Sequence, residues 1–154
     1  MNNYKLNQKW ILWNHKLNDK SWSNNSYKKI FELNNLFDYN LLIDNISIQN
    51  LQNTMFFLMR ENIFPTWEDP DNRDGCCASF KIPLKDIHIV WKNIILNIIT
   101  ENIHKNSNNY YLINGISIVP KKEFNILKIW FKKNIKKIDN IIYLDKYITS
   151  ENCR

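Results

Sequence analysis

The segment that follows Pro83 carries the most regular apolar pattern in the chain, and this pattern constrains the fold more than any other feature. Its large apolar side chains recur at the three- and four-residue spacing of a helix: Ile87, Trp91, Ile94, Ile95, Ile98 and Ile99. The spacing predicts an α-helix that runs through about Glu101, because residues so spaced share one helix face. That face is broad, so we expect the helix to pack on a β-sheet.

Short runs of branched and aromatic residues predict the strands of that sheet, at 9–15, 55–59, 79–82, 110–119, 124–131 and 141–148. Residues 120–123 separate two of these runs at the spacing of a hairpin. A second helix is predicted over 34–44, from the helical spacing of Leu33, Leu36, Phe37, Asn40 and Leu41. No glycine-rich phosphate loop is present. The pattern therefore favours an α+β fold, a single antiparallel sheet with helices on one face.

The length of 154 residues fits one domain, 1–154, whose ends at 1–4 and 150–154 we expect to be flexible. A net charge of +6 favours a polyanionic partner, although with 18 lysines each single lysine is weak evidence. No apolar run approaches the roughly 18 residues of a membrane span, and the polar N-terminus does not resemble a signal peptide. Three cysteines form no disulfide or zinc pattern. We expect a reduced, cytoplasmic protein that does not associate with membranes.

The sequence offers no arrangement for catalysis. His15, His88 and His104 have no serine, cysteine or carboxylate pattern of a nucleophilic triad around them. The aspartates within 69–74 resemble a calcium loop only faintly, because Pro70 interrupts them and the distal glutamate of such a loop is missing. We therefore expect a binding protein and not an enzyme, with no catalytic residue, no metal and no cofactor.

Two tryptophans lie in polar, turn-rich loops, where nothing local can bury them. Trp22 lies in the loop at 18–25, and Trp67 lies in the loop at 63–75, directly before Glu68. Two such indoles could sandwich one flat ring, and stacking is worth about 1–3 kcal/mol per base. A positively charged ring gains more, because the indole faces attract cations. The two acceptor oxygens of Glu68 suit the paired N–H donors of guanine, so 7-methylguanine combines both properties.

The remaining candidates follow from position. Lys128 lies two residues before Trp130 and therefore on the same strand face, where it could bind a phosphate attached to the base. Lys121 and Lys122, at the predicted hairpin, could do the same. The other tryptophans fall on regular elements and are expected in the core: Trp10, Trp13 and Trp91.

Taken together, these segments resemble the cap-binding translation initiation factor 4E family. The matching stretches are 10–13, 19–22, 63–69, 72–75, 91–96 and 129–130, in the family's order over roughly residues 6–131. The run Pro-x-Trp-Glu-Asp at 65–69, with a loop tryptophan upstream, is the specific part of the match. The resemblance implies a curved antiparallel sheet with helices packed on its convex face and the 7-methylguanosine cap of mRNA held in its concave face.

The resemblance also implies roles for the pocket residues. Trp22 and Trp67 stack the base, and Glu68 binds its Watson–Crick edge. Trp130 lies against the N7-methyl group. Lys121 aligns with the family's first phosphate-binding arginine. The full set implied for the phosphates is Lys121, Lys122 and Lys128.

The chain departs from the family in the phosphate pocket. Cys77 stands where the family has an arginine, and Ala78 replaces the tryptophan that follows it. Ile126 stands where the family has a second phosphate-binding lysine, which leaves Lys128 as its substitute. We therefore expect a retained base pocket and a remodelled phosphate pocket.

On its dorsal helices the family binds a Tyr-x-x-x-x-Leu-hydrophobic motif shared by the scaffold subunit 4G and its competitors. The corresponding residues here are Leu33, Phe37, Lys92 and Leu96. Phe37 replaces a tryptophan and lacks the indole N–H donor. We expect a monomer outside its complexes that binds capped mRNA and a 4G-like scaffold or a 4E-binding protein.

Two alternatives remain open at this point. The altered dorsal surface also fits a cap-sequestering translational repressor, or a cap-binding protein with a dedicated, non-standard scaffold. A nonspecific single-stranded RNA-binding module would use the same aromatic and basic residues. Such a module would show steep salt dependence and no preference for methylated guanine.

Overall fold

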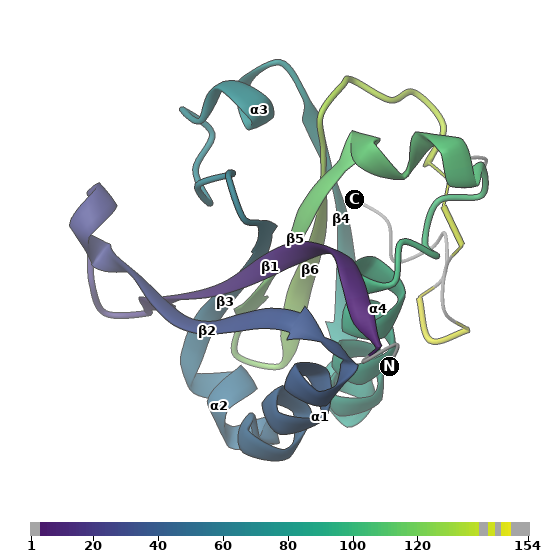
Figure 1. Ribbon diagram of the computed structural model, residues 1–154. Helices are drawn as coiled ribbons and strands as arrows, with labels where there is room; N and C mark the ends of the chain where they lie inside the picture. Colours follow the sequence, from purple (N-terminus) through teal and green to yellow (C-terminus); the bar gives the residue numbers. More distant parts are fainter. Residues whose placement is uncertain (1–3, 139–141, 144–145, 149–154) are drawn as a thin grey trace.

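Six strands form one antiparallel sheet in the computed structural model, which describes residues 4–138, 142–143 and 146–148. Their order across the sheet is β2-β1-β3-β5-β6-β4 (Figure 1). The strands are β1 (Lys5–Lys16), β2 (Tyr27–Asn35), β3 (Thr54–Arg60), β4 (Cys76–Pro83), β5 (Ile113–Pro120) and β6 (Phe124–Phe131). The predicted hairpin at 120–123 is confirmed, because β5 and β6 pair directly across it.

Three helices gather on one side of the sheet: α1 (Leu36–Asn45), α2 (Ile48–Asn53) and α4 (Ile87–Ile99) (Figure 1). The short α3 (Pro70–Arg73) lies in the loop between β3 and β4, away from the other three. The 3₁₀ helices are η1 (Asn24–Ser26), η2 (Leu84–Asp86) and η3 (Ser107–Leu112). Side-chain caps precede α1, α2 and α3. In α2, Ser47 and Asn50 bond each other's backbone N–H groups in a capping box.

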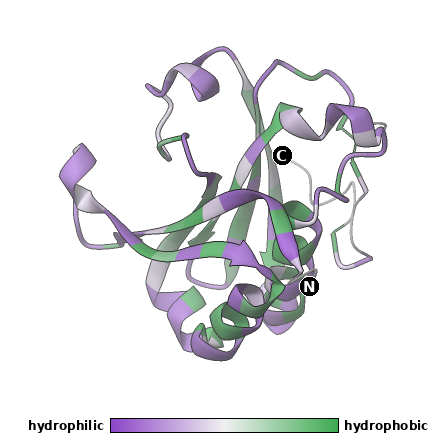
Figure 2. Ribbon diagram, in the orientation of Figure 1, coloured by the Kyte–Doolittle hydropathy of each residue, from purple (hydrophilic) through white to green (hydrophobic). Residues whose placement is uncertain are grey.

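The two faces of the sheet carry different side chains, because successive residues of a strand point in opposite directions. On one face, residues such as Phe80 and Leu127 join the core that also buries the apolar side of α4. The opposite face carries a second, smaller cluster: Ile11, Trp13, Met55, Phe57, Met59, Ile63 and Trp130. Figure 2 shows hydrophobic residues along the strands and their covering helices, and hydrophilic residues along the connecting loops.

Most of the predicted elements are confirmed. The predicted strands at 9–15, 55–59, 79–82 and 124–131 all lie within observed strands, and the helix predicted over 34–44 is α1. The helix after Pro83 is α4, with every residue of its predicted apolar face buried. The three tryptophans expected in the core are buried: Trp10, Trp13 and Trp91.

Three predictions need correction. The strand β2 was not predicted, because as an edge strand with mostly exposed side chains it lacks an apolar alternation. Residues 110–112 belong to η3, so β5 begins only at Ile113. The strand predicted at 141–148 is wrong for its described residues, where Ile142 makes a single bridge to His104 and a turn follows at 146–147. Residues 141, 144 and 145 lie outside the described residues.

The expectation of flexible ends falls mostly outside the described residues, which include only Tyr4 from the two segments. Tyr4 has defined contacts. Its carbonyl oxygen accepts a hydrogen bond from the backbone N–H of Leu36 at 3.1 Å. Its ring meets that of Phe37 edge-on, with centroids 6.0 Å apart.

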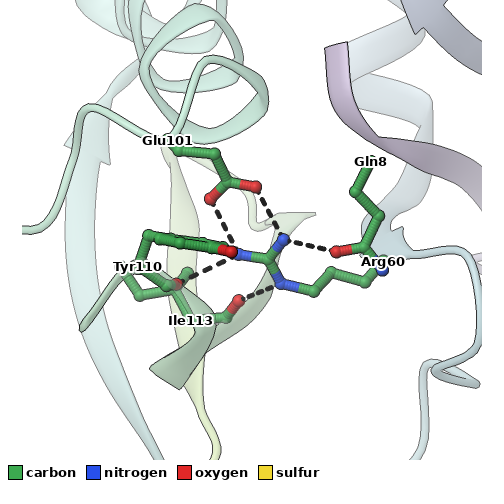
Figure 3. Close-up of polar contacts among 5 residues, drawn as sticks. All are labelled: Gln8, Arg60, Glu101, Tyr110 and Ile113. Atoms are coloured by element: carbon green, nitrogen blue, oxygen red, sulfur yellow. Dashed lines mark hydrogen bonds and ion pairs between the residues drawn. The ribbon is translucent and has the colours of Figure 1, made fainter. Parts of the chain in front are cut away.

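A buried arginine joins the central strands to the end of α4. Arg60 ends β3, and its guanidinium donates to the two carboxylate oxygens of Glu101 at 2.7 and 2.8 Å (Figure 3). It also donates to the side chain of Gln8 and to the carbonyl oxygens of Tyr110 and Ile113. All five N–H donors therefore have acceptors, which is the condition for burying such a charge at tolerable cost.

Replacing Glu101 with glutamine should leave the buried guanidinium without a neutralising charge. We expect Glu101→Gln to lower the free energy of unfolding by about 3 kcal/mol, the cost of breaking a buried pair. Urea denaturation measures this change. The matched control is Glu61→Gln, which removes an exposed ion pair with Lys9 at 3.5 Å and should change stability little. Equal effects of the two substitutions would contradict this role for Arg60.

Candidate functional site

A pocket of about 350 Å³ lies over the second apolar cluster, on the face of the sheet that α4 does not cover. Both loop tryptophans line it. The lining comes from two loops and four strands: Trp22, Tyr27, Met55, Phe57, Pro65, Thr66, Trp67, Glu68, Ser117, Val119, Lys128 and Trp130. The structure therefore brings together five of the residues predicted for cap binding: Trp22, Trp67, Glu68, Lys128 and Trp130.

The strand register explains how residues distant in sequence reach one pocket floor. Phe57 on β3 lies opposite Ser117 on β5, and Ser117 lies opposite Lys128 on β6. Residues directly opposite in antiparallel strands have their side chains on the same face. Trp130 follows Lys128 by two residues and lies on that face as well, next to the row.

The loop between β1 and β2 presents Trp22 in an unusual backbone conformation. Its φ of 50° lies in the region that a bulky residue adopts at a cost of about 1–3 kcal/mol. Asp19 shapes the loop, since its carboxylate accepts from the backbone N–H and the hydroxyl of Ser21. These hydrogen bonds hold the pKa of the Asp19 carboxyl below its usual value. The Trp22 indole stacks on the buried ring of His15, with centroids 4.1 Å apart and planes at 13°.

The loop between β3 and β4 is held by a buried asparagine. The Asn72 side chain donates to the carbonyl oxygen of Phe64 at 3.0 Å and accepts from Asn114 of β5 at 2.9 Å. Asp69 is the N-cap of α3, and its carboxylate accepts from the backbone N–H of Phe64 at 2.8 Å. These bonds lie on both sides of Trp67 in the sequence, so the loop that carries the indole is anchored to the sheet.

Trp67 rests against a second tryptophan. Its ring stacks on that of Trp130, with centroids 5.0 Å apart and planes at 30°. Trp130 is itself fixed, because its indole N–H donates to the hydroxyl of Ser117 at 3.0 Å. Trp22 and Trp67 thus each have a neighbouring ring against one face, yet they are 54% and 45% exposed. Both rings line the same pocket, and each is partly exposed to solvent.

Glu68 brings a negative charge to the pocket wall. Burial and, to a smaller extent, the charge of Glu68 raise the pKa of the Tyr27 phenol. Glu68 and Tyr27 both line the pocket. A ligand with paired N–H donors or a positive charge would complement it.

The residues predicted for phosphate binding occupy different places. Lys128 lines the pocket, whereas Lys121 and Lys122 are exposed at the turn between β5 and β6 and do not line it. Cys77 lies opposite Trp130 on β4, and burial raises the pKa of its thiol to about 12. A thiol with this pKa is neutral near pH 7, so Cys77 cannot supply the charge of an arginine.

The residues predicted for partner binding are divided by the fold. Phe37 on α1 is 60% exposed and Leu96 on α4 is 37% exposed. The two helices are neighbours, because the hydroxyl of Tyr39 on α1 donates to the carbonyl oxygen of Lys92 on α4 at 2.9 Å. Leu33 lies on β2 instead of a helix, and its side chain is completely buried. In this structure Leu33 offers no surface to a partner.

Sequence reasoning missed three residues that shape these surfaces. His15 was considered only for catalysis, although its place at the end of a predicted strand beside the Trp22 loop was a usable signal. The sequence identifies Asn72 only as part of a loop, since its bond to Asn114 depends on tertiary structure. Tyr4 fell in an end expected to be flexible. Neither Asn72 nor Tyr4 has a local pattern that predicts its contact.

The described residues hold no group of three or more histidine, cysteine, aspartate or glutamate side chains placed to bind a metal ion. No helix formed by these residues is long and apolar enough to span a membrane.

The sequence matches the model of one protein family, eukaryotic initiation factor 4E, over residues 5–149. The initiation factor 4E of Saccharomyces cerevisiae is 28% identical over 138 residues, which are 85% of this chain and 63% of the yeast protein. A 4E homologue of Acanthamoeba polyphaga mimivirus is 33% identical over 69 residues, 45% of this chain and 25% of that protein. The chain thus spans less than two thirds of either relative.

Solved structures give the same fold. The eIF4E-3 protein of Ascaris suum, solved with the m7G cap, has a TM-score of 0.76 at 20% identity, covering 87% of this chain and 76% of that one. A schistosome eIF4E, solved with m7GpppG and a 4E-binding protein, has a TM-score of 0.77 at 16% identity, covering 88% and 76%. With a family model that matches nearly its whole length, this chain belongs to the eukaryotic initiation factor 4E family.

Proposed function

We propose that this protein binds the 7-methylguanosine 5′ cap of mRNA and acts in translation initiation. One observation carries the proposal: Trp22 and Trp67 approach one pocket from separate loops, each with an open ring surface, and Glu68 lies beside the second. Binding is the whole of this function, which requires no chemical step.

The pocket has the properties that a methylated guanine requires. N7-methylation gives the base a positive charge, and a cationic ring gains extra attraction from indole faces, about 0.5–2 kcal/mol. Stacking adds about 1–3 kcal/mol per base. Glu68 would accept the two N–H donors of the guanine edge, and Trp130, held by Ser117, would support the methylated side of the ring.

The helix side of the sheet offers a surface for a protein partner. Exposed Phe37 and Leu96, with Lys92 one turn before Leu96, lie on the adjacent helices α1 and α4. We expect this surface to bind an amphipathic motif of a 4G-like scaffold or of a 4E-binding protein. Buried Leu33 would contribute only by supporting the surface from below.

Loss of either loop indole should remove most of the cap affinity. We expect Trp22→Ala and Trp67→Ala each to weaken binding of 7-methyl-GTP at least 30-fold, about 2 kcal/mol, because each removes one side of the sandwich. Tryptophan-fluorescence titration measures the affinities, and stacking should quench the emission of the unsubstituted protein.

The control for this pair is Tyr111→Ala, which removes an exposed aromatic ring on η3 that does not line the pocket. It should bind 7-methyl-GTP as the unsubstituted protein does. Full binding by both tryptophan variants would rule out the proposed sandwich. Equal affinity for 7-methyl-GTP and GTP in the unsubstituted protein would instead support a nonspecific nucleotide or RNA site.

Glu68 should determine which base is accepted. We expect Glu68→Gln to reduce the preference for 7-methyl-GTP over 7-methyl-ITP, which lacks the exocyclic amine of guanine, because one acceptor oxygen becomes a donor. We expect the unsubstituted protein to prefer 7-methyl-GTP over 7-methyl-ITP by about tenfold or more, and the Glu68→Gln variant to bind the two nucleotides with nearly equal affinity. Competition titrations with the two nucleotides provide the readout. If the ratio of the two affinities is the same in Glu68→Gln as in the unsubstituted protein, Glu68 does not bind the guanine edge.

A further inference from the structure

A second lysine lies beside the one in the pocket wall. Lys128 on β6 is opposite Ser79 on β4, and Lys81 on β4 is opposite Ile126 on β6. Lys81 follows Ser79 by two residues, so it lies on the same face of the sheet as Lys128. Residues in this diagonal relation are about 7–8 Å apart, within reach of two long side chains.

Both ammonium groups are available to an anion. Among the described residues, neither Lys81 nor Lys128 forms an ion pair with a carboxylate. The Nζ of Lys81 lies 4.3 Å from the centroid of the Phe124 ring, a cation–π contact that keeps the charge close to the sheet surface. Both lysines are half-buried, where charges interact more strongly than in bulk water.

The two lysines lie on a path that leads out of the pocket. Along one face of β6, Trp130 and Lys128 belong to the pocket lining, and Ile126 and Phe124 continue toward the turn. Lys81 is opposite Ile126 and therefore lies one step beyond Lys128 in that direction. Lys121 and Lys122 lie in the turn at the end of the path.

We propose that Lys81 and Lys128 together bind the phosphate chain of a nucleotide whose base occupies the pocket. The proposal rests on the proposed cap-binding function and adds Lys81 to the site. Ammonium groups bind phosphates as point charges and need no fixed planar geometry, so two flexible lysines suit successive phosphates. They supply the positive charge that the neutral thiol of Cys77, on the same face of β4, cannot.

The experiment compares two ligands that differ only in phosphate, 7-methylguanosine and 7-methyl-GTP. Lys81→Gln should weaken 7-methyl-GTP about tenfold, as expected for one lost charge-assisted contact, and leave the nucleoside unchanged. Lys81→Arg should retain most of the affinity. The control is Lys85→Gln on η2, which removes the same charge from an exposed position that does not line the pocket.

Salt dependence gives an independent readout. In a plot of log affinity for 7-methyl-GTP against log salt, Lys81→Gln should have a shallower slope than Lys85→Gln, because fewer cations contact the phosphates. Equal loss for nucleoside and nucleotide in Lys81→Gln would assign Lys81 a structural role and overturn the proposal.

The remaining outcomes are also distinguishable. Unchanged nucleotide affinity in Lys81→Gln, with tight binding by the unsubstituted protein, would overturn the role of Lys81 and leave cap binding intact. Binding of neither ligand by the unsubstituted protein would overturn both proposals.

Discussion

Side chains of successive strand residues point to opposite faces, and in this sheet α1, α2 and α4 cover only one of those faces. The uncovered face must shield its apolar residues with its own side chains and with the loops that fold over it. Aromatic rings shield much of this face, as the edge-on contacts of Phe64 with Trp13 and Tyr27 illustrate. Because helices cover only one face of the sheet, aromatic rings on the other face form the floor of the pocket, and the loop indoles form its border. Such a pocket suits a flat ligand.

Two buried polar groups keep this arrangement in place. The Arg60 guanidinium links β3 to β1, to β5 and to Glu101, two residues beyond the end of α4, so the covered face and the central strands are fixed together (Figure 3). Asn72 ties the Trp67 loop to β5. On the other side of the pocket, hydrogen bonds between Ser21 and Asp19 shape the loop, and the Trp22 ring is placed by its strained backbone and its stack on His15. One wall of the proposed sandwich is therefore held by a buried side chain, and the other by a local turn and a ring contact.

Sequence reasoning recovered the parts of this structure that have local signals. The periodicity of α4 predicted its buried face, and tryptophans in polar loops predicted two walls of the pocket, because a large ring without local cover indicates a site. The edge strand β2 and the buried position of Leu33 were missed, since an exposed strand has no apolar alternation. Lys81 was missed because its place beside Lys128 depends on the β4–β6 register, which no local pattern encodes.

A crystal structure of the protein with 7-methyl-GTP would show whether a methylated guanine lies between the two loop indoles. We expect the base stacked between Trp22 and Trp67, with its donor edge on the carboxylate of Glu68. Electron density for the nucleotide anywhere else, with the space between the two indoles unfilled, would contradict it.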